Sequence, residues 1–169
     1  MTPIMVIPLA LLSLGVVGWG FWRAARSYWK FRGRRIVTCP ETGLPAAVDL
    51  AMRHIAVTAA FRGPSLQLRD CSRWRERAPC NQPCLRQIEA APEEFLVLTI
   101  LAKWYQGKTC ICCGRSLGQF TRWGHKPCLM SPDLRMLEWK DVQTEDIPGM
   151  LATHAPVCRT CLLAETHTS

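Results

Sequence analysis

Two Cys-x2-Cys pairs constrain the C-terminal part of this chain more than any other feature. Cys110 and Cys113 are followed after 44 residues by Cys158 and Cys161, and Gly114 directly follows the first pair. A tetrahedral Zn²⁺ site needs four ligands, and four thiolates can supply them at about 2.3 Å from the metal. A glycine just past the first pair allows the tight turn with positive φ that points both sulfurs at one centre. We therefore predict one metal site built from these four cysteines.

The two pairs resemble the zinc-ribbon and rubredoxin-like group of four-cysteine knuckles over about residues 108–163. This resemblance implies a β-hairpin between the pairs, and short strand-like segments at 116–123 and 135–139 are available to form strands. Cys112 and Cys128 are then surplus. Cys112 is expected to face away from the metal, with a register that uses it as a ligand as the alternative, and Cys128 fits a small buried hydrophobic residue. His125 is an alternative ligand, and His154 is a candidate partner of the ligands.

A second set of four cysteines lies in the N-terminal half: Cys39, Cys71, Cys80 and Cys84. Its spacing of 31, 8 and 3 intervening residues matches no standard zinc finger. These residues lie in segments predicted to be loops, where Cys39 is followed by a proline and Cys80 is preceded by one. A second Zn²⁺ site is our prediction. An iron–sulfur cluster, which four thiolates also hold, and disulfides or free thiols are the alternatives.

A charge-free run of 20 residues, Pro3 to Trp22, precedes all of these motifs. As a helix it would be about 30 Å long, the thickness of the hydrocarbon core of a bilayer. Residues 1–22 are therefore predicted to form a single transmembrane helix. A cleaved signal peptide is disfavoured, since no positive residue precedes the run and no clear cleavage site follows it, and a buried core helix is the remaining alternative.

Six basic side chains and no acidic one occupy residues 23–35: Arg23, Arg26, Lys30, Arg32, Arg34 and Arg35. The positive-inside rule then predicts a single-pass membrane protein with its soluble part in the cytoplasm, and a juxtamembrane segment that contacts anionic lipid. A nucleic-acid-binding arm is the alternative. Nucleic acid is disfavoured as a partner, because residues 36–169 are nearly neutral, with 15 basic and 13 acidic side chains. A cytoplasmic location keeps cysteines reduced, which favours metal binding over disulfides.

The soluble part is predicted to have an α+β fold. Strand patterns at 36–50 and 65–70 alternate with helix patterns at 51–63 and 85–90, and 91–107 is expected to be a buried central helix. We divide the chain into a Cys-containing α+β subdomain at 36–107 and a zinc-ribbon-like subdomain at 108–169.

No catalytic motif is present: there is no P-loop, no dinucleotide-binding glycine fingerprint and no Gly-x-Ser-x-Gly motif. We therefore predict a non-enzymatic, membrane-anchored protein with structural Zn²⁺ at one or two sites. It would act as an accessory or interaction module of a membrane-associated complex, with a protein partner. The alternatives are an iron–sulfur electron-transfer subunit and a thiol-redox or metal-handling protein with a reactive Cys112.

Overall fold

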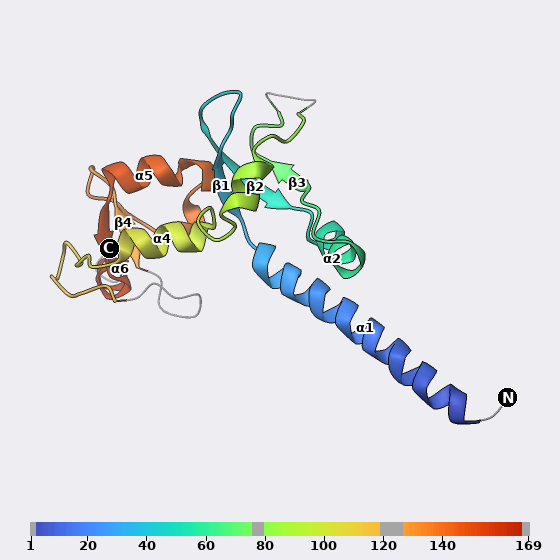
Figure 1. Cartoon of the computed structure of the whole chain (residues 1–169). Helices are drawn as coiled ribbons and strands as arrows, with labels where there is room; N and C mark the ends of the chain where they lie inside the picture. Colours follow the sequence, from blue (N-terminus) through green and yellow to red (C-terminus); the bar gives the residue numbers. More distant parts are fainter. Residues whose placement is uncertain (1–2, 76–79, 119–126, 167–169) are drawn as a thin grey trace.

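The computed structural model describes residues 3–75, 80–118 and 127–166, and the fold is a mixture of helices and antiparallel sheets (Figure 1). The elements in chain order are α1 (Pro3–Phe31), β1 (Arg35–Thr38), β2 (Pro45–Leu50), α2 (Met52–Phe61), β3 (Leu68–Cys71), α3 (Leu85–Ala90), α4 (Val97–Tyr105), β4 (Cys128–Met130), β5 (Met136–Leu137), the 3-10 turns η1 (Trp139–Asp141) and η2 (Thr144–Asp146), α5 (Ile147–Thr153), β6 (Ala155–Val157) and α6 (Arg159–Thr166). The α+β part of the sequence prediction is therefore correct.

The first sheet has the strand order β1-β2-β3, with both neighbouring pairs antiparallel. Most of β2 is buried because the end of α1, α2 and α3 pack around this sheet, which explains its nearly unbroken apolar sequence. The centre of this core contains Val37, Val48, Ile55 and Ile88, all almost completely buried. These residues lie in the segments predicted to be strands, at 36–50, and helices, at 51–63 and 85–90.

Arg35 connects α1 to the first sheet through a fully buried guanidinium group. The group donates hydrogen bonds to the carbonyls of Lys30, Phe31, Gly33 and Pro92. Burial lowers the pKa of Arg35 to about 10, so the group keeps its charge at neutral pH. The carbonyls at the end of α1 favour this cation, as helix C-termini generally do. Arg35 therefore does not belong to an exposed basic surface.

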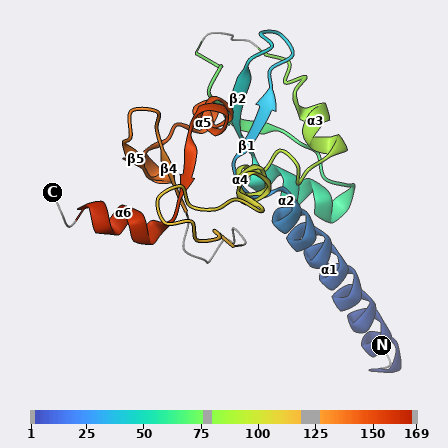
Figure 2. The same ribbon diagram turned by 90° about the vertical axis from the view of Figure 1, so that its left-hand side faces the viewer.

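The second sheet has the order β5-β4-β6 and is also antiparallel, and α6 follows β6 directly (Figure 2). Its core is small, with Val157 and Leu162 packed against buried cysteines. A third cluster joins β1 to this part of the chain through Ile36, Leu101 of α4 and Ile147 of α5. The predicted division into subdomains at 36–107 and 108–169 is not tested by these contacts and stays a prediction.

The predicted helix at 91–107 is shorter in the structure and begins only at Val97. Residues 95–97 instead pair with the chain entering β1, because Ile36 donates to the carbonyl of Phe95 and Val97 donates to that of Arg34. The helix is also only partly buried, with Leu101 and Tyr105 as its fully covered side chains. Most of the predicted strand at 116–123 lies outside the described residues. His125 and His167 also lie outside them.

Helix α1 extends away from the rest of the molecule toward the N-terminus (Figure 1). Within the described part of the chain, no helix combines the length and the apolarity needed to cross a bilayer. The prediction of a transmembrane helix over 1–22 is therefore wrong, and so is the single-pass, cytoplasm-facing localisation derived from it. Lipid contact by Arg23, Arg26, Lys30, Arg32 and Arg34 is not tested and stays a prediction.

Candidate metal centre

A tight loop carries the first Cys-x2-Cys pair. Its ends are joined by a β-bridge between Thr109 and Ser116, and the amide of Cys110 donates to the carbonyl of Arg115 at 2.9 Å. Inside the loop, the amide of Gly114 donates to the carbonyl of Cys110 at 2.9 Å. Gly114 has φ +69°, a conformation that costs glycine little and most other residues more. The sequence prediction of a glycine-dependent turn at this position is confirmed.

The second pair lies where β6 passes into α6. Cys158 follows the last residue of β6, and Cys161 lies one turn further on in α6, so both side chains lie on the same side of the helix start. The cysteine loop contacts this element directly, because the amide of Ile111 donates to the carbonyl of Pro156 at 3.0 Å. Pairing of β6 with β4 places Val157 opposite Cys128 and fixes this edge of the sheet. Two segments far apart in the sequence thus meet at one place.

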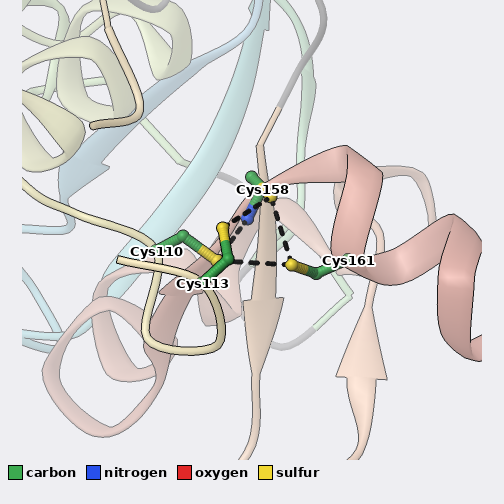
Figure 3. Close-up of side chains that lie close together, drawn as sticks. All are labelled: Cys110, Cys113, Cys158 and Cys161. Atoms are coloured by element: carbon green, nitrogen blue, oxygen red, sulfur yellow. Dashed lines mark hydrogen bonds between the residues drawn. The ribbon is translucent and has the colours of Figure 1, made fainter. Parts of the chain in front are cut away.

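The four sulfurs of this centre all lie within 4.8 Å of one another (Figure 3). The Sγ–Sγ distances are 3.9 Å for Cys110–Cys161, 3.7 Å for Cys113–Cys158 and 3.4 Å for Cys158–Cys161. In a regular tetrahedron with ligands about 2.3 Å from the metal, the sulfurs would be about 3.8 Å apart. The side chains therefore already have nearly the spacing of a tetrathiolate metal site.

Hydrogen bonds shift the pKa values of two of these cysteines in opposite directions. Burial raises the pKa of Cys110, but the amides of Cys158, Cys113 and Cys112 donate to its sulfur and outweigh burial, so that the net shift is downward. The amide of Cys158 lies 3.2 Å from that sulfur. The pKa of Cys161 is raised, chiefly because its neighbour Cys158, and then Cys113, interact with its sulfur. Cys110 therefore favours the thiolate and Cys161 favours the thiol, and a cation that binds here must displace the proton of Cys161.

The two surplus cysteines of this region lie outside the set. The side chain of Cys112 is exposed, as expected if it faces away from the metal. Its pKa is raised, first by desolvation and then by the negative charge of Cys110, which disfavours a reactive thiolate. Cys128 is buried in the core of the second sheet, and its carbonyl accepts a hydrogen bond from Tyr105. The prediction of a small buried residue at this position is confirmed.

The second predicted set is arranged differently. Its four cysteines all line one small cavity beside the first sheet: Cys39, Cys71, Cys80 and Cys84. Their sulfurs do not reach the mutual spacing of the first set, which is the one group of this kind among the described residues. Burial raises the pKa of Cys71, and it raises that of Cys84 to about 11. The side chain of Thr42, which hydrogen-bonds to the sulfur, is the main cause of a lowered pKa at Cys39.

The histidines that the structure describes do not join either set. His54 is exposed on α2, and the ring of His154 hydrogen-bonds to the hydroxyl of Thr153 at 2.8 Å. The sequence interpretation missed the amide of Cys158, which donates to the sulfur of Cys110 from the opposite segment. No side-chain pattern could have indicated it, because the donor is a backbone group positioned by β4–β6 pairing.

No protein-family model, no curated protein and no solved structure matches this chain. The cysteine centre is consistent with the zinc-ribbon-like group of knuckles, and that likeness rests on the four cysteines alone.

Proposed function

We propose that this protein is a zinc-binding module in which one Zn²⁺, held by Cys110, Cys113, Cys158 and Cys161, fixes the C-terminal part of the fold. The observation that carries the proposal is the near-tetrahedral spacing of the four sulfurs. Zinc is the proposed metal because tetrahedral sites of four thiolates are typical of structural zinc. The donors come from two segments, so one ion would join the loop at 109–116 to the start of α6.

A structural role follows from the number of ligands. Catalytic zinc keeps a coordination position for water or substrate, whereas four thiolates occupy every position of a tetrahedral ion. We therefore propose an accessory or interaction module rather than an enzyme, with a protein as its partner. The protein partner is a proposal that follows from this structural role and not from any contact in the molecule.

Metal analysis of the full chain, purified without oxygen, tests this proposal. We expect bound zinc and no absorption in the visible range. Visible absorption that bleaches on reduction with dithionite would instead identify an iron–sulfur cluster and overturn the proposal.

Adjacent cysteines provide a matched pair of variants for the same analysis. Cys113→Ser removes a proposed ligand and should lose one zinc ion per chain. Cys112→Ser changes the exposed neighbour and should keep the zinc content of the wild type. Equal zinc loss in both variants would show that the assignment of ligands is wrong.

A further inference from the structure

The loop that carries Cys110 has a close structural counterpart around Cys39. In the first, the amide of Cys110 donates to the carbonyl of Arg115, and its carbonyl accepts from the amide of Gly114, both at 2.9 Å. In the second, the amide of Cys39 donates to the carbonyl of Leu44 at 2.9 Å, and the amide of Gly43 donates to the carbonyl of Cys39 at 2.8 Å. The two glycines, each four residues after its cysteine, have the same φ of +69°. The chain therefore builds the same turn twice.

In both turns, backbone amides also donate hydrogen bonds to the sulfur of the first cysteine. The amides two and three residues after Cys110 donate to its sulfur. In the second loop, the amides of Glu41 and Thr42 occupy these two positions and donate to the sulfur of Cys39. Successive backbone amides directed at one atom stabilise negative charge on it. This arrangement suits a sulfur that binds a cation as a thiolate.

Three further cysteines approach Cys39 from other elements. Cys71 ends β3, where it pairs with Val48 of β2, and the amide of Arg73 donates to its sulfur. Cys80 and Cys84 precede α3, and the amide of Gln82 donates to the sulfur of Cys80 at 3.3 Å.

Gln82 fixes this segment against the first sheet. It has φ +56°, a conformation unusual for a residue other than glycine. Its side-chain oxygen accepts a hydrogen bond from the amide of Leu68 in β3 at 2.9 Å. The unusual backbone conformation is thus held by a specific contact, and it directs an amide at a cysteine sulfur.

The cavity that these cysteines line together with other residues is large enough for a single ion. All four line a cavity of about 20 Å³, and roughly 10–15 Å³ suffices for one water molecule. The cavity adjoins the core of the first sheet, where Cys84 is buried and Cys39 and Cys71 pack against it. Thiolates are soft ligands, and four of them favour Zn²⁺ over hard cations such as Mg²⁺ or Ca²⁺.

From this repeated turn and shared cavity, we propose that Cys39, Cys71, Cys80 and Cys84 form a second zinc site, which connects the β1–β2 turn, β3 and the segment before α3. The ion would draw the sulfurs from their present spacing to about 3.8 Å. The proposal extends the proposed function from one structural zinc to two. It depends on different residues, so either site can fail without the other.

Zinc stoichiometry of the full-length protein and its variants tests the second site. The wild type should hold two zinc ions per chain. Cys71→Ser should hold one, Cys113→Ser should also hold one, and Cys112→Ser should hold two. The second site would be overturned, and the first left intact, if the wild type holds one zinc ion, Cys113→Ser holds none and Cys71→Ser still holds one. If the wild type holds one zinc ion, Cys71→Ser holds none and Cys113→Ser still holds one, the second site is supported and the first is refuted.

A measurement on the wild type covers the case in which Cys71→Ser does not fold. Cysteines of the zinc-loaded protein are alkylated and identified by mass spectrometry, with and without a chelator. Zinc should slow the alkylation of Cys39, Cys71 and Cys80 by about tenfold or more, because a thiolate bound to the metal is no longer free to attack the reagent. Cys112, whose exposed sulfur is not a proposed ligand, should be modified readily in both conditions. Equal rates for Cys39 and Cys80 with and without chelator, or a disulfide between them in the freshly purified protein, would overturn the second site.

Discussion

Cys158→Ser is the substitution expected to have the largest effect on the C-terminal part of the fold. The sulfur of Cys158 lies 3.7 Å from that of Cys113 and 3.4 Å from that of Cys161. Its backbone amide also donates to the sulfur of Cys110, and this bond does not depend on the side chain of Cys158. The substitution therefore removes one proposed ligand and leaves the neighbouring backbone contact in place.

The size of the effect follows from how little else holds this region. Among the described residues, the buried cluster around the proposed ligands contains two aliphatic side chains, Val157 and Leu162, beside Cys110, Cys128 and Cys158. The partly buried Leu117, Met130 and Met136 pack against it, and Leu129 of β4 is also buried. Burial of one aliphatic side chain contributes about 1.5–3 kcal/mol. Structural zinc contributes about 10–16 kcal/mol of apparent binding free energy at neutral pH. Loss of the metal should therefore unfold β4, β5 and β6, whereas the first sheet has its own core around Val48 and Ile55.

Hydrogen exchange followed by mass spectrometry measures both sheets in one experiment. In Cys158→Ser, peptides covering 128–137 and 155–162 should lose their protection, and peptides covering 35–50 should keep it. Cys112→Ser is the control, because its exposed side chain should change the free energy of unfolding by less than about 0.5 kcal/mol. Equal loss of protection in the two variants, or unchanged protection in Cys158→Ser, would refute the proposed metal support.

Three further predictions concern the junction at α1 and the protonation of the metal centre. Arg35→Met removes the donor to the buried carbonyl of Phe31 and to the partly buried carbonyl of Gly33, and it should lower the free energy of unfolding in urea by about 3 kcal/mol or more. A loss as small as that of exposed Arg34→Met would contradict this. Gly33→Ala should lower the free energy of unfolding by about 1–3 kcal/mol in the same assay. The new Cβ would lie 2.8 Å from a methyl carbon of Leu96, and the backbone φ of Gly33 is +108°. Gly149→Ala is the control, because no atom lies within 4 Å of the Cβ added there. The dissociation constant for zinc should rise as pH falls from 8 to 6, because the raised pKa of Cys161 means that its proton must leave when the metal binds; a constant that does not change with pH would contradict this.

The first sheet could be predicted from sequence because its local signals and its packing agree. The apolar strands at 36–50 flank a turn with proline and glycine, and Ile55 and Ala59 lie on the buried face of α2. The start of α4 could not be predicted in the same way. Residues 91–96 have a good helical pattern, but hydrogen bonds to Arg34 and Ile36 hold the end of this segment beside β1 instead. Tertiary pairing thus overrides local propensity where the two conflict.

The centre at Cys110 was predictable because a second cysteine stands three residues after the first. At Cys39 that position is held by Thr42, whose side chain hydrogen-bonds to the sulfur instead of ligating a metal. The feature common to both loops is the cysteine followed four residues later by a glycine with positive φ, as in CPETG and CICCG. It is the backbone turn that directs amides at the sulfur. A pattern based on Cys-x3-Gly therefore captures the turn itself, and the remaining ligands can come from elements far away in the sequence, as Cys71 and Cys84 do here.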